Sequence, residues 1–246
     1  MGRGAILRRC LHQLIMTTIS ANLQAVRERI SAAALACGRH PDSIELLAVS
    51  KTWPADAVLA AAAAGQRAFG ENYVQEGVHK AESLAAHAFC WHFIGPLQSN
   101  KTRRVAETFA WVHSIDRIKI AERLSEQRPV HLPPLEVCVQ VNVSGEASKS
   151  GVTPAEAGAL ARSVAALPRL RLRGLMAIPE PVDDIEAQRA PFRRLRELYE
   201  TLRAEGLALD TLSMGMTHDL EAAIAEGATI VRVGTAIFGV RNAVAA

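Results

Sequence analysis

The sequence predicts an α/β fold, a single-domain (β/α)8 barrel of the TIM type. Short apolar or β-branched runs alternate with longer stretches rich in alanine and leucine, the pattern of repeated βα units around a parallel sheet. About eight such runs can be read, and eight strands close a TIM-type barrel. An open doubly wound sheet is the alternative, but no Gly-x-Gly-x-x-Gly fingerprint follows the first expected strand.

The first fifteen residues differ in composition from the rest of the chain. Residues 1–15 contain three arginines and no acid, which accounts for the whole formal net charge of +3. They are expected to be a disordered basic extension, or to precede the natural start, and residues 16–246 to form the barrel domain. From Met16 a helix is expected, with Leu23, Val26 and Ile30 at helical spacing.

Eight strands and seven helices are expected after this first helix, which should end near Gly38. The expected strands are 44–50, 67–70, 91–94, 111–115, 136–143, 172–178, 211–214 and 229–233. The expected helices are 54–64, 73–86, 99–108, 117–127, 154–167, 185–205 and 218–226. No linker rich in Gly, Ser or Pro divides them, so we expect one domain.

Composition excludes several classes of protein. With 49% hydrophobic and 22% charged residues, the 246-residue chain is neither disordered nor collagen-like. Beyond residue 15 the formal charge is zero, so no nucleic-acid surface is expected. No apolar run approaches the roughly 20 residues that span a bilayer. Four widely spaced cysteines without metal-ligand spacing indicate no metal site and buried free thiols in a reducing cytosol: Cys10, Cys37, Cys90 and Cys138.

Polar residues follow the expected strands at the end where a parallel barrel carries its active site. Lys51 comes directly after the first strand, where a partly buried amine becomes a nucleophile, although a solvated surface lysine is the simpler interpretation. Ser213 lies at the end of the seventh expected strand, and Gly234 and Thr235 follow the eighth, where barrels commonly bind phosphate. A lysine beside a phosphate site leaves two chemistries open, a Schiff-base aldolase acting on a sugar phosphate and a pyridoxal phosphate protein.

Five separated motifs resemble one family in the correct order. They are Leu47-Ala-Val-Ser-Lys-Thr52, Phe69-Gly-Glu-Asn-Tyr-Val-Gln-Glu76, Trp91-His-Phe-Ile-Gly-Pro-Leu-Gln-Ser-Asn-Lys101, Arg173-Gly-Leu-Met-Ala-Ile178 and Val231-Arg-Val-Gly-Thr-Ala-Ile-Phe-Gly239. Together they are similar to the YggS/PROSC family of pyridoxal phosphate homeostasis proteins. The likeness runs from about Ile19 to Arg241.

The resemblance implies a barrel like the N-terminal domain of alanine racemase, of fold type III among pyridoxal phosphate proteins. It implies pyridoxal phosphate bound to Lys51 as a Schiff base. The other implied cofactor-binding residues are Asn72 at the ring, Arg232 at the pyridine nitrogen, and Ser213, Gly234 and Thr235 at the phosphate. Thr217 stands where the family usually has serine, and it keeps the hydroxyl.

An arginine at the pyridine nitrogen has a chemical consequence. A guanidinium only donates hydrogen bonds, so the nitrogen facing it stays unprotonated and the ring becomes a poor electron sink. The alternative is that Arg232 simply pairs with a neighbouring acid such as Glu226.

The expected function is therefore intracellular pyridoxal phosphate homeostasis, by buffering or delivery to apo-enzymes that require it, and the chain is expected to be a cytoplasmic monomer. An amino-acid enzyme such as a racemase is the alternative. Weak candidates for catalytic residues are Tyr73 and His92, with Lys101 as a further proton donor or ligand clamp. Lys149 is considered as a second amine for released cofactor, although a surface lysine is the simpler interpretation.

Overall fold

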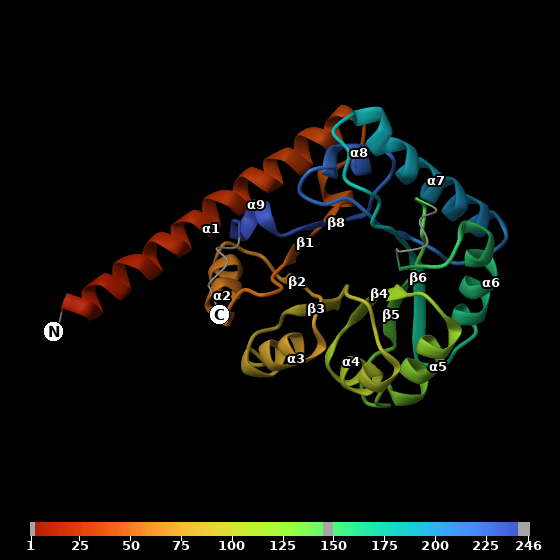
Figure 1. Ribbon diagram of the computed structural model, residues 1–246, viewed down its shortest axis with the longest axis horizontal. Coiled ribbons are helices and arrows are strands. Elements are labelled where there is room, and N and C mark those ends of the chain that lie inside the picture. The colour runs from red at the N-terminus through yellow and green to blue at the C-terminus, as the bar shows by residue number, and fades with distance from the viewer. Residues whose placement is uncertain (1–2, 145–149, 241–246) are drawn as a thin grey trace.

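Eight parallel strands form a closed barrel in chain order, β1 to β8, in the computed structural model (Figure 1). The structure describes residues 3–144 and 150–240. The strands are β1 Glu45–Val49, β2 Ala68–Glu71, β3 Cys90–Phe93, β4 Trp111–Ile115, β5 Leu135–Gln140, β6 Leu170–Met176, β7 Thr211–Ser213 and β8 Ile230–Val233. All eight predicted strands are confirmed. The fifth is shorter than predicted, ending at Gln140 instead of residue 143.

Helices connect the strands and cover the outside of the barrel. They are α2 Ala55–Ala63, α3 Val74–Ser83, α4 Thr102–Thr108, α5 Ile118–Gln127, α6 Pro154–Ala165, α7 Ile185–Ala204, α8 Leu220–Ala225 and α9 Thr235–Phe238. Short 3-10 turns precede β1 and α4, at Pro41–Ser43 and Ser99–Lys101. The start of α6 has the predicted proline, preceded by Thr153, which forms a capping box with Glu156. The helix expected to start at residue 218 starts two residues later.

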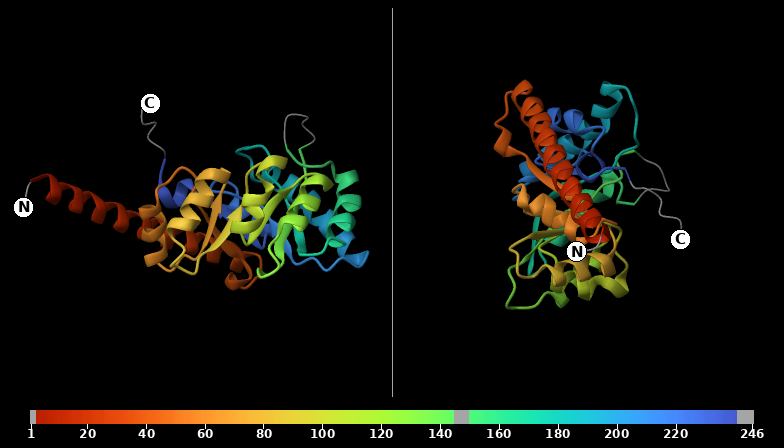
Figure 2. Two further views of the ribbon diagram at one scale, coloured as in Figure 1. Left: turned by 90° about the horizontal axis from the view of Figure 1, so that it is seen from below. Right: turned by 90° about the vertical axis from the view of Figure 1, so that its left-hand side faces the viewer.

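The first helix, α1, differs most from its prediction. It is one continuous helix from Arg3 to Ala36, so the expected start at Met16 is wrong and the helix continues through the segment predicted to be disordered. Its N-terminal part projects beyond the barrel (Figures 1 and 2). Its C-terminal part packs through buried side chains at helical spacing, including the predicted Leu23, Val26 and Ile30.

The buried apolar residues form two clusters. The larger lies between the sheet and the helices, and the smaller lies among inward-facing strand residues: Leu47, Val49, Ala68, Ile94, Trp111, Cys138, Met176 and Ile230. Polar side chains share that interior, among them His92, His113, Ser213 and Arg232, each at most 3% exposed. Since buried polar groups need partners, these side chains must bond to one another.

Two other expectations can be compared with the structure. Free thiols are found at Cys37, Cys90 and Cys138, but the expectation that they are buried holds only for Cys138, because Cys37 is exposed and Cys90 half-buried. In the described part of the chain, none of the helices combines the length and the apolar character that crossing a membrane requires.

Candidate cofactor site

A pocket of about 210 Å³ opens at the carboxyl ends of the strands. Its lining residues are Val49, Lys51, Asn72, Ile94, Ile178, Met216, Thr217, His218, Arg232, Gly234 and Thr235. Five of the six predicted cofactor-binding residues are among them. The sixth, Ser213, is not. Lys51, Gly234 and Thr235 also line an adjoining pocket, whose wall includes Trp53 stacked against Phe238 with ring centroids 5.9 Å apart.

Lys51 stands on a tight turn directly after β1. The backbone N–H of Trp53 donates to the carbonyl of Ser50 at 3.0 Å, which closes the turn around Lys51 and Thr52. Thr52 has a φ of +64°, a conformation that β-branched residues rarely adopt and that costs on the order of 1–3 kcal/mol. Lys51 itself is half-buried. The turn therefore fixes the backbone around Lys51 at the pocket, with the unusual φ at Thr52.

Arg232, on β8, is a buried cation in the wall of the pocket. Its guanidinium donates to Ser213 Oγ at 2.9 Å and to the carbonyl of Ala177 at 2.8 Å. Burial lowers the pKa of Arg232 to about 10, so it stays protonated at neutral pH. The alternative pairing with Glu226 is wrong.

Glu226 is engaged elsewhere, on the outside of the barrel. Its carboxylate pairs with three arginines of α7, Arg189 at 2.8 Å, Arg193 at 3.1 Å and Arg196 at 3.2 Å. Glu226 is therefore not the partner of Arg232, whose hydrogen bonds lie inside the barrel.

Ser213 is the predicted site residue that lies elsewhere. Its side chain is fully buried, and besides Arg232 it contacts His113, whose Nδ1 lies 2.7 Å from Ser213 Oγ. In this structure Ser213 Oγ is therefore engaged by Arg232 and His113 and does not line the pocket. Its phosphate-binding role stays a prediction.

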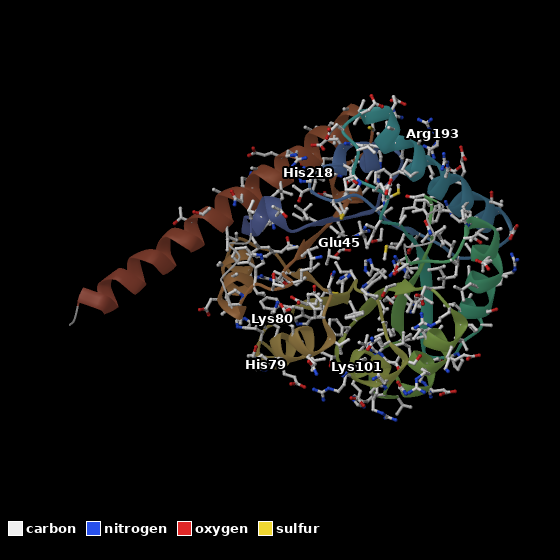
Figure 3. The ribbon with its side chains drawn as sticks, in the orientation of Figure 1. Glu45, His79, Lys80, Lys101, Arg193 and His218 are labelled. Carbon is white, nitrogen blue, oxygen red and sulfur yellow. The ribbon has the colours of Figure 1, made fainter. Side chains whose placement is uncertain are left out.

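The loop after β7 supplies two pocket residues that sequence reasoning missed, Met216 and His218, beside Thr217, which it noted without assigning to the site. Met216, Thr217 and His218 line the pocket, and the carbonyl of Thr217 accepts a 3.0 Å bond from Arg29 of α1. His218 and Lys101 lie on opposite sides of the barrel (Figure 3). The available signal was Thr217 itself, which replaces the serine usual in the family motif and keeps the hydroxyl that can serve a phosphate.

The weaker candidates lie outside the pocket. His92 is fully buried inside the barrel, with Nδ1 2.9 Å from His113 Nε2 and its ring stacked on Trp111. Tyr73 is 54% exposed and lines, together with Lys101, a neighbouring groove that shares Asn72 with the pocket. Lys149 lies outside the described residues.

Comparison with known proteins shows the family of this chain. The family model described as "Alanine racemase, N-terminal domain" matches residues 21–242. The chain is 63% identical to the pyridoxal phosphate homeostasis protein of Pseudomonas aeruginosa, over 92% of this chain and 97% of that protein. It is 56% identical to the same-named protein of Escherichia coli, over 92% and 98%. The chain belongs to the family of pyridoxal phosphate homeostasis proteins.

Solved structures place this homeostasis family in a wider fold group. PipY of Synechococcus elongatus, solved with pyridoxal phosphate bound, superposes with a TM-score of 0.79 at 38% identity, over 90% of this chain and all of PipY. Alanine racemase of Corynebacterium glutamicum superposes with a TM-score of 0.69 at 18% identity, over 92% of this chain and 62% of the racemase. The second likeness shows a shared fold alone, which confirms the predicted alanine racemase-like barrel.

The buried histidine pair should make this homeostasis protein sensitive to acid. Burial lowers the pKa of His92 to about 3, and burial, His92 and Arg232 together lower that of His113. The unfolded chain therefore binds protons below about pH 6.5 that the folded chain does not, and the free energy of unfolding falls with pH. We expect the pair to remove roughly 3 kcal/mol between pH 6.5 and 5.0. Urea unfolding across this range measures the loss.

A variant assigns that loss to the histidines. His92→Gln should reduce the pH slope by about one proton, or about 1.4 kcal/mol per pH unit. His79→Gln, at an exposed position on α3, should leave the slope unchanged. Equal slopes in all three proteins would show that the buried pair does not cause the acid sensitivity.

Gly95 allows the β2 and β3 ends to approach closely. A Cβ at residue 95 would overlap the backbone carbonyl of Asn72, a pocket residue. Gly95→Ala should therefore displace Asn72 and weaken cofactor binding at least about tenfold, because small misplacements at a site have large effects. Titration of the apo-protein with pyridoxal phosphate checks this. Gly158→Ala on α6, where the added methyl would meet only side chains, is the control, and equal affinities would contradict the prediction.

Proposed function

We propose that this chain binds pyridoxal phosphate as a Schiff base on Lys51 and serves pyridoxal phosphate homeostasis by buffering or delivering the cofactor. One observation carries the proposal: the same pocket is lined by a lysine amine, a buried guanidinium and a threonine hydroxyl, from Lys51, Arg232 and Thr217. The relative PipY, at 38% identity, was solved with pyridoxal phosphate bound.

The residues present fit the cofactor. Bound pyridoxal phosphate supplies an electrophilic aldehyde and a heteroaromatic ring. Lys51 is the amine of the pocket that can hold the aldehyde carbon covalently. The hydroxyls of Thr217 and Thr235 can donate to phosphate.

Arg232 favours a carrier over a catalyst. Its guanidinium stays charged and donates hydrogen bonds. A pyridine nitrogen that accepts such a bond therefore stays unprotonated. A ring without that proton is a poorer electron sink for a carbanion, so amino-acid turnover should be slow. Of the candidate second acid–base residues, His92 is sealed inside the barrel, and Tyr73 is 54% exposed in the neighbouring groove beyond Asn72.

Several properties remain predictions. The recipients of a delivered cofactor are proposed to be apo-enzymes that require pyridoxal phosphate. The chain is proposed to act as a cytoplasmic monomer, for which sedimentation or light scattering of the purified protein is the direct measurement.

The testing experiment is an absorption spectrum of the purified protein, before and after borohydride, followed by mass spectrometry of the peptide that carries Lys51. We expect a visible band that borohydride removes and a pyridoxyl adduct on Lys51. If no band forms with excess pyridoxal phosphate, the proposal fails and a sugar-phosphate aldolase becomes the better hypothesis. Incubation with L-alanine separates carrier from racemase, because robust formation of D-alanine would favour the enzyme.

A further inference from the structure

Below the Lys51 turn lies a buried charge cluster that the proposed function does not use. It consists of Glu71 at the end of β2 and Glu76 and Lys80 on α3, and we call it the α3 clamp. Glu71 is fully buried and Lys80 is 4% exposed, whereas His79, the neighbour of Lys80 on α3, faces solvent (Figure 3). Buried ion pairs are weak contributors to stability, so their position needs another reason.

Lys80 ties three acceptors together. Its ammonium donates to Glu71 Oε1 at 2.6 Å, to Glu76 Oε1 at 2.9 Å and to the backbone carbonyl of Ser50 at 2.7 Å. An ammonium has three N–H donors, so each is engaged. The carbonyl of Ser50 is the peptide group that immediately precedes Lys51.

Glu76 holds the other side of Lys51. Its Oε1 accepts the backbone N–H of Thr52, the peptide group that follows Lys51. Thr52 is the residue with the positive φ, and such strain persists only where surrounding contacts fix it. Ser50 adds a further link, because its Oγ donates to Glu71 Oε1 at 2.6 Å. Both peptide groups flanking Lys51 are thus bonded to one rigid cluster.

We propose that the α3 clamp positions Lys51 for attack on the cofactor aldehyde, with Glu76 and Lys80 as positioning residues. This rests on the proposed function. The reaction is Schiff-base formation. The neutral Lys51 amine forms a bond to the aldehyde carbon, and its two protons leave with the aldehyde oxygen as water. A misplaced amine slows this step, since about 1 Å of error can cost on the order of a hundredfold.

The test compares Glu76→Leu with a matched change on the same helix. Glu82→Leu removes an exposed ion pair of α3 to Arg104, 2.9 Å long, and leaves the clamp intact. We expect Glu76→Leu to lower the rate constant for Schiff-base formation, followed by stopped-flow absorbance, at least about tenfold relative to Glu82→Leu. Glu76→Gln keeps a carbonyl oxygen for Thr52 and should restore most of the rate.

A second readout uses the apo-protein. Amide exchange of the peptide spanning residues 50–53, measured by mass spectrometry, should accelerate in Glu76→Leu and remain slow in Glu82→Leu and Glu76→Gln. The double variant Glu71→Gln/Lys80→Met removes the fully buried carboxylate together with the ammonium and leaves only the partly exposed Glu76 carboxylate charged. It should show the same slow Schiff-base formation.

The outcomes are distinguishable. Unchanged rates and unchanged exchange in Glu76→Leu, with a normal adduct in the unmodified protein, would overturn the positioning role alone. Absence of a Lys51 adduct in the unmodified protein would overturn the proposed function and this inference together. A slow rate in Glu76→Gln as well as in Glu76→Leu, with Glu76→Gln melting at the temperature of the unmodified protein, would also contradict the role assigned to the Thr52 contact.

Discussion

Replacing Lys51 with arginine should abolish the borohydride-trapped adduct while leaving the protein folded. Arginine keeps the positive charge and much of the stem, but a guanidinium stays protonated and is no nucleophile. Lys51 is half-buried at the rim of the pocket, so the larger head group can be accommodated at the open side. We expect complete loss of the visible band, measured by absorbance, and of the labelled peptide, measured by mass spectrometry.

Lys51→Ala separates the covalent bond from the charge. If charge alone retains the cofactor, arginine should keep noncovalent binding that alanine loses, which equilibrium dialysis detects. The exposed Lys119→Arg serves as the matched control and should retain the full adduct. A borohydride-stable adduct that persists in Lys51→Arg would show that another lysine holds the cofactor, and Lys51 would lose its proposed role.

Gly174→Ala should be among the most destabilising single changes in the barrel. A Cβ at this position of β6 would overlap the carbonyl of Thr211 on β7, and a backbone group cannot give way as a side-chain tip can. The register between β5 and β6 also shifts beside it, between Val137 and Cys138, as at a β-bulge. We expect a loss of at least about 3 kcal/mol in the free energy of unfolding, measured in urea.

Gly158→Ala again provides the control, because this glycine lies in α6 and the added methyl would meet the side chains of Leu202 and Arg162. Alanine is the better helix former by about 1 kcal/mol, so this variant should be neutral or more stable. A Gly174→Ala protein within about 0.5 kcal/mol of the unmodified chain would mean that β6 and β7 can separate more easily than their packing indicates.

Local patterns were sufficient to predict the strands and most helices. Each strand is a short apolar run between helical stretches, and such runs need no knowledge of distant residues. The expected helix start at Met16 is too late, because α1 continues back to Arg3 across the change in charge near residue 15. A change from basic to mixed composition does not end a helix, because the backbone hydrogen bonds continue through it.

Position within the barrel was harder to predict. Ser213 lies near the end of the seventh predicted strand and Thr217 follows it, and sequence alone did not distinguish the side chain inside the barrel from the one at the mouth. In the structure Ser213 bonds to Arg232 and His113, and Thr217 lines the pocket. The His92–His113 contact joins β3 to β4 and likewise depends on the register of the closed sheet.

The sequence by itself determined the eightfold alternation of strands and helices and the position of Lys51 at a strand end, because both depend on the side-chain period of local segments. Only the tertiary structure decided what surrounds that lysine. Lys80 reaches the carbonyl of Ser50 across thirty positions of chain, and Arg232 meets Ala177 across fifty-five. Such contacts arise because barrel closure brings the ends of all eight strands together, and register and depth then select which polar groups share the interior.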